Sequence, residues 1–184
     1  MQSHYSDLLV IGAGLAGERV AVEAAEKGFS VICLSIVPAR RSHSSAAQGG
    51  MQAALGNSVM GEGDSPDVHF ADTVKGSDWG ADQEVARLFA DAAPIEMRRL
   101  AGWGVPWNRV VAGKDTYLQS GETIEKVEQK DTEGLITARA FGGTAKWRTA
   151  HTSERTGHVV MCTMEHRLAL PGLTRPDRKD ASTL

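Results

Sequence analysis

An eleven-residue run of the sequence combines residue types that suit a planar cofactor. Residues 40–50 read Arg-Arg-Ser-His-Ser-Ser-Ala-Ala-Gln-Gly-Gly, so one histidine, His43, stands among small hydroxyl and methyl side chains. Small residues let backbone N–H groups approach a ligand closely, and glycine adopts dihedrals that other residues avoid. The run therefore offers backbone donors, hydroxyl groups and one imidazole. A Ser/Gly-rich turn with a surface histidine is the alternative interpretation.

A dinucleotide-binding pattern precedes this run. Residues 12–17 read Gly-Ala-Gly-Leu-Ala-Gly, which matches G-x-G-x-x-G. They follow an apolar stretch at residues 7–11, typical of a strand buried on both faces, and they open a helical pattern. We expect Gly12 to form the tight turn, Gly14 to let a pyrophosphate approach, and Gly17 to let the helix pack on the strand. The positive end of the helix would face the pyrophosphate.

One position departs from the general dinucleotide fingerprint. A carboxylate some twenty residues further on usually binds the ribose hydroxyls, but Ser35 stands there, after a second apolar stretch at residues 29–34. A hydroxyl also hydrogen-bonds a ribose, although more weakly than a carboxylate does. On this chemistry alone, NAD and FAD both remain open as the cofactor.

The run around His43, placed after the fingerprint, resembles the flavin-attachment segment of the flavoprotein subunits of fumarate reductases and succinate dehydrogenases. The resemblance implies FAD as the cofactor, with a covalent bond from His43 to the 8α-methyl carbon of the flavin. That family often has serine at the position of Ser35. The resemblance implies cofactor-binding roles for Gly12, Ala13, Gly14, Leu15, Ala16, Gly17, Ser35, Ser42, His43, Ser44, Ser45, Gln48, Gly49, Gly50 and Ala181.

Several later segments extend the resemblance almost to the end of the chain. Residues 104–109 resemble a segment that sets an aromatic residue near the substrate, so Trp107 would be a wall of the dicarboxylate pocket. A core tryptophan under a Pro turn is an equally good interpretation of Trp107. Residues 139–144 resemble the Phe-Gly-Gly turn that lies close to the flavin, and residues 177–184 resemble the start of a strand that meets the adenine half of FAD.

The resemblance also implies an activity and partners. Members of the family transfer a hydride between flavin N5 and the C2/C3 atoms of fumarate or succinate. They exchange electrons with an iron–sulfur subunit and, through it, with a membrane-anchored cytochrome b that handles quinone. The motifs look closest to the menaquinol-linked fumarate reductases. The implied location is cytoplasmic, peripheral on the cytoplasmic face of the inner membrane through the partner subunits.

The 184-residue chain resembles only the N-terminal third of such a subunit. We expect the capping domain, the proton-donating arginine and the dicarboxylate clamp to be absent, so this chain holds no catalytic residue. Its arginines, among them Arg139 and Arg148, match no catalytic position. The chain alone would lack turnover, expose apolar sheet surface and tend to aggregate.

Composition excludes several other classes of function. The net charge is −3, from 20 Lys and Arg against 23 Asp and Glu, which argues against a nucleic-acid surface. No apolar run approaches the length of a membrane span. Two cysteines, Cys33 and Cys162, lack metal-ligand spacing and are predicted to be buried small hydrophobes. The spacings of seven and eight residues between His151, His158 and His166 fit no compact metal motif, so no metal is expected.

The predicted fold class is α/β: a Rossmann-like FAD-binding domain over residues 1–184 with an incomplete parallel sheet. Strands are expected at residues 7–12, 29–35 and 178–184. Ser65 and Pro66 should start a helix that ends near Gly76, and His69 within it is predicted to be structural.

Further helices are expected at residues 51–55, from residue 82 onward, and from residue 157 to 169 with Thr156 as its cap. The second of these would present an apolar face to the protein, made of Val85, Leu88, Phe89 and Ala92, and Pro94 would kink or split it.

Two alternatives to the enzyme subunit remain. L-Aspartate oxidase shares the glycine fingerprint and the Ala-Gln-Gly-Gly run but lacks the attachment histidine, so His43 argues against it. A non-catalytic flavin- or nucleotide-binding fragment is the other alternative.

Overall fold

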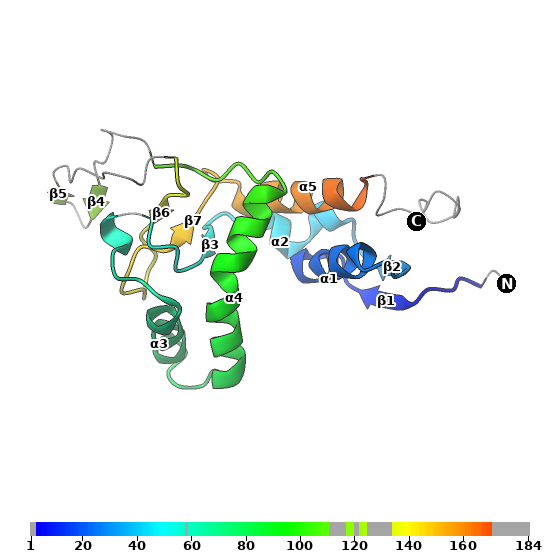
Figure 1. Ribbon diagram of the computed structural model, residues 1–184, viewed down its shortest axis with the longest axis horizontal. Helices are drawn as coiled ribbons and strands as arrows, with labels where there is room; N and C mark the ends of the chain where they lie inside the picture. Colours follow the sequence, from blue (N-terminus) through cyan, green and yellow to red (C-terminus); the bar gives the residue numbers. More distant parts are fainter. Residues whose placement is uncertain (1–2, 58, 111–116, 120–121, 125–133, 171–184) are drawn as a thin grey trace. The chain divides into compact units, whose positions relative to one another are not determined.

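The computed structural model of the chain describes residues 3–57, 59–110, 117–119, 122–124 and 134–170 (Figure 1). Its contacts divide the chain into two compact units. The first consists of Met1–Gln48, Trp103–Val105 and Arg155–Leu184, and the second of Gly49–Gly102 and Pro106–Glu154.

The first unit starts with the predicted strand, helix and strand. Strand β1 (Leu8–Ile11) pairs in parallel with β2 (Val31–Leu34), and helix α1 (Leu15–Glu26) connects them. The predicted strands at residues 7–12 and 29–35 are thus confirmed, with slightly shorter bounds. The third predicted strand, residues 178–184, lies outside the described residues, and so does Ala181.

Helix α5 (Thr156–Leu168) packs against α1 and against a short helix α2 (His43–Ala46), which follows the 3-10 turn η1 (Ala39–Arg41). Their shared core is apolar and fully enclosed: Ala21, Val22, Val160, Met161 and Met164. The predicted cap of α5 is wrong by one residue, because Arg155 is the N-cap and Thr156 is already helical and buried. The close approach of the next residue, Gly157, to α2 draws the first turn of α5 into the core.

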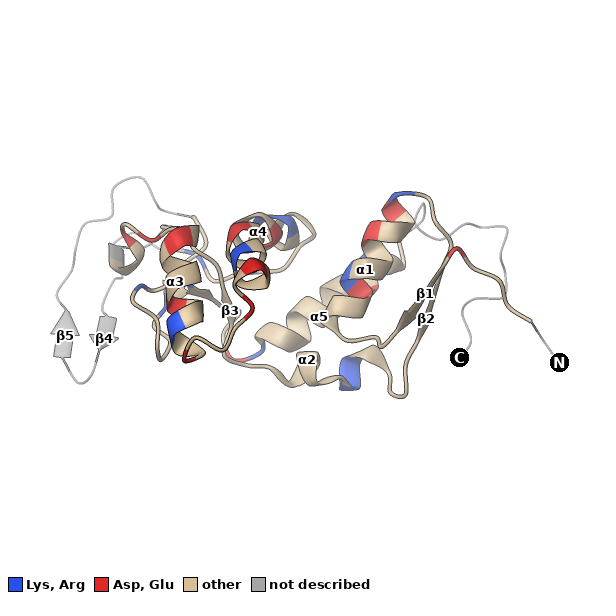
Figure 2. Ribbon diagram, turned by 90° about the horizontal axis from the view of Figure 1, so that it is seen from below, with Lys and Arg blue, Asp and Glu red and all other residues tan. Residues whose placement is uncertain are grey.

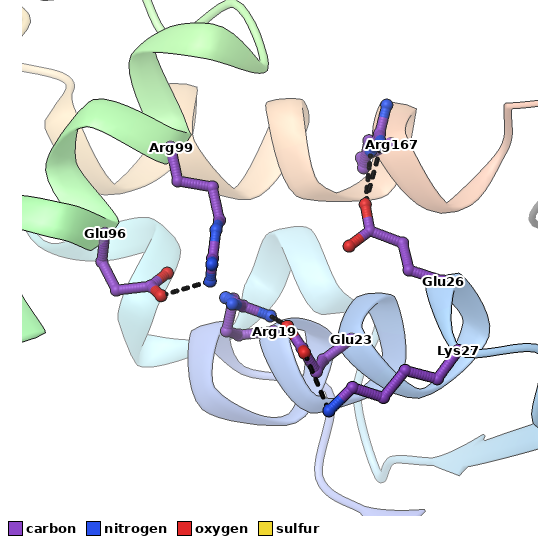
Figure 3. A network of polar contacts seen from close by, with 7 residues as sticks. All are labelled: Arg19, Glu23, Glu26, Lys27, Glu96, Arg99 and Arg167. Carbon is purple, nitrogen blue, oxygen red and sulfur yellow. Dashed lines mark hydrogen bonds and ion pairs between the residues drawn. The ribbon is translucent and has the colours of Figure 1, made fainter.

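Exposed polar contacts also join α5 to α1 (Figure 3). Arg167 Nη2 lies 2.7 Å from Glu26 Oε1, and Glu23 accepts from Arg19 and Lys27 on its own helix. The guanidinium groups of Arg19 and Arg167 lie 5.4 and 5.5 Å from the centre of the Trp103 ring. Such exposed ion pairs stabilise a fold by about 0.2–1 kcal/mol each, so the apolar core dominates this helix contact.

The sheet of the first unit exposes apolar side chains, as expected. Leu9 and Ile11 on β1 are 55% and 81% exposed, and Leu34 on β2 is 54% exposed. Parallel sheets normally have both faces covered, so apolar side chains exposed to this degree on a parallel strand pair are unusual in a folded protein.

Two helices form the main part of the second unit. Helix α3 (Pro66–Gly76) begins as predicted, with the Ser65 hydroxyl accepting from the Val68 N–H at 3.2 Å. It packs on α4 (Gln83–Gly102), which continues through Pro94 without a break. His69 on α3 is 2% exposed, which agrees with its predicted structural role.

The predicted core face of α4 is wrong. Val85, Leu88 and Phe89 are 61%, 70% and 51% exposed, and Ala92 is also exposed. The buried face instead consists of Ala86, Ala90, Pro94, Met97 and Leu100. Small residues at this four-residue spacing permit close packing, and that packing outweighed the larger apolar side chains on the opposite face.

The second unit also contains an antiparallel sheet of three short strands. Strand β7 (Thr149–Ala150) lies between β3 (Met51–Gln52) and β6 (Ala138–Arg139). The helix predicted at residues 51–55 is therefore wrong, because pairing with β7 holds this segment extended. A 3-10 turn η2 (Val59–Gly61) and a hairpin of β4 (Tyr117–Gln119) and β5 (Glu122–Ile124) complete the described elements.

Charged residues of both signs are interspersed along α1, α3 and α4 (Figure 2). Among the described helices, none has the length and apolar character needed to cross a bilayer.

Candidate functional site

The fingerprint turn in the first unit has the geometry that its glycines predict. Gly12 has φ +106°, a conformation that favours glycine, and its N–H donates to the Leu34 carbonyl at 2.7 Å. A Cβ atom at Gly17 would lie 1.8 Å from the Gly12 carbonyl oxygen. The tight turn at Gly12 and the close helix–strand packing at Gly17 are therefore confirmed.

The N-terminus of α1 forms an open cradle beside this turn. Its N-cap, Gly14, supplies no side-chain hydrogen bond, and no atom lies within 4 Å of a Cβ built on Gly12. The first N–H groups of a helix have no partner within the helix and carry the positive end of its dipole. Ser35 follows β2 at the same sheet edge, since Leu34 pairs with Ile11. The positive end of α1 therefore suits an anionic ligand, and Ser35 lies at the same edge of the sheet.

The segment that carries His43 is attached to this cradle through its neighbour, Ser44. The Ser44 hydroxyl accepts from the Leu15 N–H of α1 at 3.1 Å. A Cβ atom at Gly14 would lie 3.3 Å from the same hydroxyl oxygen, so a side chain here would crowd it. His43 itself is exposed at the start of α2. The structure thus brings the two predicted motifs of the first unit together.

Helix α5 also contacts α2 and the residue that follows it. The Gly157 N–H donates to the Ala47 carbonyl at 2.8 Å, and a Cβ atom at Gly157 would lie 2.0 Å from the Ser44 carbonyl oxygen. His158 Nδ1 lies 3.4 Å from the Ser45 hydroxyl. Sequence reasoning assigned no role to Gly157, because nothing local shows which backbone a glycine will approach.

A buried carboxyl group lies next to the cradle. Glu18, in the first turn of α1, is 3% exposed, and its pKa is raised to about 7, mainly because it is buried. The Glu165 carboxylate contributes to this rise, whereas Arg40, which pairs with Glu165, opposes it. Sequence reasoning missed this residue. The signal was its spacing: Glu18 shares the buried face of α1 with Ala21 and Val22.

The glycine pair that ends the His43 run belongs to the second unit. Arg139 donates to the Gly49 carbonyl from Nη2 at 2.8 Å and from Nε at 3.2 Å. A Cβ atom at Gly49 would lie 3.2 Å from the Phe141 ring. Gly50 has φ +117°, and a Cβ there would lie 2.6 Å from the Ala150 carbonyl oxygen. The Phe-Gly-Gly turn and the Gly-Gly pair, both predicted to lie at the flavin, therefore contact each other.

An enclosed charge network is centred on Arg148, the residue before strand β7, and β7 is the strand that contacts Gly50. The Arg148 side chain is fully buried and contacts Asp64 through two hydrogen bonds, of 2.8 and 3.0 Å. Its third nitrogen lies 2.8 Å from Asp72. His69 is buried nearby, and desolvation lowers its pKa, with Arg148 acting in the same direction and Asp64 and Asp72 opposing it. Sequence reasoning did not find this network, since its members are up to 84 residues apart.

Comparison with known proteins identifies this arrangement. The profile of the FAD binding domain family matches residues 7–184. The chain belongs to the FAD binding domain family. It is 49% identical over 180 residues to the fumarate reductase flavoprotein subunit of Helicobacter pylori strain 26695, covering 98% of this chain and 25% of that protein. It is 37% identical over 163 residues to the succinate dehydrogenase flavoprotein subunit of Bacillus subtilis, covering 89% of this chain and 24% of that protein.

Solved structures give the same result. The Mycobacterium smegmatis Sdh1 complex in the apo form matches with a TM-score of 0.75 and 32% identity, covering 91% of this chain and 24% of that one. The chain spans about a quarter of the length of the curated relatives it matches. The predicted α/β FAD-binding fold, the resemblance to fumarate reductase and succinate dehydrogenase flavoproteins and the cofactor FAD are confirmed.

The described residues fit FAD. Gly14 supplies no capping side chain, and although the Leu15 N–H donates to Ser44, the start of α1 and the side-chain-free space at Gly12 suit a pyrophosphate, the part of FAD that a helix N-terminus binds best. The individual contacts predicted for Gly12 to Gly17, Ser35, Ser42 to Ser45, and Gln48 to Gly50 remain predictions. So does the role of Ala181.

Trp107 is buried in the second unit, at 3% exposure, and no partner for its indole N–H is found in the described part of the chain. The next residue, Asn108, donates its N–H to the His151 carbonyl at 2.9 Å. Burial lowers the pKa of His151, Arg139 lowers it further, and Glu154 opposes them. Trp107 as a pocket wall and Trp107 as a core residue both remain compatible with these contacts.

The two cysteines differ from their prediction. Cys33 is exposed and Cys162 is half-buried, with its sulfur 3.6 Å from His158 Nε2. The cause is the exposed outer surface of β2 and α5. Within the described residues, no three His, Cys, Asp or Glu side chains are grouped as a metal site.

Proposed function

We propose that this sequence belongs to a flavoprotein subunit that binds FAD covalently through His43 and interconverts fumarate and succinate. Fumarate reduction with electrons from menaquinol is the favoured direction, and identity to a fumarate reductase subunit of 49%, against 37% to a succinate dehydrogenase subunit, supports this preference. The structural observation that supports attachment is the Ser44–Leu15 hydrogen bond, since it ties the residue after His43 to the dinucleotide cradle.

The residues of the chain would divide the binding of FAD between them. The N–H groups at the start of α1, apart from that of Leu15, which donates to Ser44, would bind the pyrophosphate, and Ser35 would bind a ribose hydroxyl. Gly49 and Gly50 would present backbone donors to the ring system, because neither carries a side chain that would block it. Bound FAD would supply a two-electron acceptor and donor for hydride transfer.

His43 would act as the nucleophile for attachment. A ring nitrogen of His43 forms the new bond to the 8α carbon, and one C–H bond at that carbon breaks. Both the nitrogen-bound hydrogen and the carbon-bound hydrogen leave as protons, and the electron pair stays on the ring system. Dioxygen or another two-electron acceptor then removes that pair. The exposed position of His43 leaves its ring accessible for this reaction.

Partners and location follow from the same proposal. The intact subunit would pass electrons to or from an iron–sulfur subunit and, through it, a membrane-anchored cytochrome b, and it would be peripheral on the cytoplasmic face of the membrane. Trp107 would line the dicarboxylate pocket, with its indole N–H available as a donor.

The test uses the intact subunit, expressed from the complete reading frame that carries this sequence. The purified protein is denatured and separated by electrophoresis, and flavin fluorescence of the protein band is recorded. The band should fluoresce, His43→Ala should abolish the fluorescence, and His166→Ala, which changes an exposed histidine of α5, should leave it unchanged. A fluorescent band in His43→Ala would reject the attachment site. Fumarate reduction with a reduced viologen dye tests the activity, and its absence in flavin-loaded protein would reject the proposed reaction.

A further inference from the structure

Arg139 makes an unusual contact with the glycine pair of the second unit. Two of its guanidinium nitrogens, Nη2 and Nε, donate to one backbone oxygen, that of Gly49, at 2.8 and 3.2 Å. Its Nη1 lies 3.2 Å from Glu154, whose side chain is 75% exposed, whereas the Arg139 side chain is 33% exposed. The partly buried end of Arg139 is therefore committed to a peptide carbonyl, and its ion pair lies on the solvent side.

This contact fixes the direction of a neighbouring donor. The Gly49 carbonyl and the Gly50 N–H belong to one peptide unit, which is planar and trans, so they point in opposite directions. Arg139 holds the carbonyl, and the Gly50 N–H must therefore point away from Arg139. Among the described residues, no acceptor is found for that N–H.

Other residues of the second unit restrict this peptide. Phe141 packs close to Gly49, since a Cβ there would lie 3.2 Å from its ring, and β7 packs close to Gly50, since a Cβ there would lie 2.6 Å from the Ala150 carbonyl oxygen. Arg139 is itself placed by the sheet, because it lies opposite Thr149 of β7. Two glycines with full conformational freedom in the unfolded chain thus adopt one orientation.

We propose that Arg139 is a positioning residue for the flavin: it orients and polarises the Gly49–Gly50 peptide so that the Gly50 N–H donates to an acceptor atom of the isoalloxazine ring. A cation that binds a peptide oxygen strengthens the N–H of the same peptide as a donor, as in any hydrogen-bonded chain. The inference rests on the proposed FAD site, and it assigns to Arg139 a role that requires no contact with FAD.

The experiment measures reversible binding, in the intact subunit with His43→Ala so that no covalent bond forms. Dissociation constants for FAD and for ADP, which carries only the adenine half, are measured by calorimetry. Arg139→Met should weaken FAD binding about tenfold, the usual worth of a charge-assisted hydrogen bond, and leave ADP binding unchanged. Arg139→Lys keeps the charge but loses the bidentate contact with the Gly49 carbonyl, so its affinity for FAD should lie between that of wild type and that of Arg139→Met.

Arg109→Gln is the matched control. Arg109 also donates to a backbone carbonyl of the second unit, that of Gly134 at 3.2 Å, but in the described residues it has no hydrogen bond to Gly49 or Gly50 and should not change FAD binding. Unchanged FAD affinity in Arg139→Met overturns the inference, and so does an equal loss for FAD and ADP, which indicates general damage to the fold. If Arg139→Met does not fold, Arg139→Lys decides: weaker FAD binding at an unchanged melting temperature supports the role, and unchanged binding overturns it. A wild-type subunit without covalent flavin would reject the attachment proposal while leaving this comparison valid.

Discussion

Replacing Arg148 by methionine should destabilise the second unit strongly. The Arg148 and Asp64 side chains are both fully enclosed, and in the described part of the chain the Asp64 carboxylate accepts both of its hydrogen bonds from Arg148. Arg148→Met leaves this carboxylate buried without a counter-charge, which costs about 3–5 kcal/mol. Asp72 suffers less, because it is 16% exposed and keeps the Ala145 N–H as a donor at 2.9 Å. A double variant, Arg148→Met with Asp64→Leu, removes both buried charges and should recover most of the loss.

Hydrogen exchange is the suitable assay, because it reports local opening free energies in a chain of two units. The Ala53 N–H donates to the Arg148 carbonyl at 2.9 Å, so its exchange reports on the sheet directly. It should exchange roughly 10²–10⁴ times faster in Arg148→Met, if opening of the sheet carries the whole cost of about 3–5 kcal/mol. The control is Arg87→Met, which breaks an exposed pair with Asp67 and should cost under about 1 kcal/mol. Equal exchange in Arg148→Met and Arg87→Met would show that the buried network contributes nothing beyond a surface pair.

Three further predictions concern the cradle and the substrate. The pKa of Glu18 is about 7 in the folded protein against an ordinary 4.5, so the folded state holds this proton more tightly than the unfolded state does. The contribution of protonated Glu18 to stability is therefore complete below pH 4.5 and is lost as the pH rises through 7. The melting temperature should fall between pH 5 and 8 in wild type but not in Glu18→Gln, and a fall that persists in Glu18→Gln would assign the pH dependence to another group. Gly157→Ala places a Cβ 2.0 Å from the Ser44 carbonyl oxygen, so it should lower the free energy of unfolding by about 1–3 kcal/mol and reduce flavin attachment. Gly102→Ala, with no atom within 4 Å of its Cβ, should have neither effect. Unchanged flavin attachment in Gly157→Ala would mean that α2 tolerates the displacement. Trp107→Phe removes the indole N–H and should raise the KM for fumarate several-fold at constant flavin content, and a lower melting temperature with unchanged KM would make Trp107 a core residue.

The sequence predicted the elements whose signals are local. Strand β1, the turn at Gly12, α1 and β2 follow from an apolar run, a glycine pattern and helical spacing, all within residues 7–35. Helix α3 was predicted for the same reason, since the Ser65 cap and Pro66 are adjacent in sequence to the helix they start. The errors fall where a distant segment decides. Residues 51–52 are extended because β7, almost 100 residues later, pairs with them.

Candidate site residues show the same division. His43, Ser44 and the glycines were found because their types form a recognisable run, and the structure places Ser44 against the fingerprint as that run requires. The supporting residues were not found. A single arginine in a sequence has many surface roles, and only the fold shows that Arg148 is enclosed by two aspartates or that Arg139 holds the Gly49 carbonyl.

Small residues in this chain are required by protein contacts as much as by the cofactor. Glycine is required at three positions because a Cβ there would lie within 3.0 Å of a backbone carbonyl oxygen. Gly17 would meet the Gly12 carbonyl, Gly50 the Ala150 carbonyl and Gly157 the Ser44 carbonyl. By contrast, Gly12 has open space around it, and Gly14 meets only a serine hydroxyl. A side chain at the first three positions would displace backbone, whereas at Gly12 and Gly14 it would mainly occupy the space of the ligand, although the positive φ of Gly12 adds strain. Loss of flavin without loss of fold is therefore expected from substitution of Gly14 alone among these five glycines.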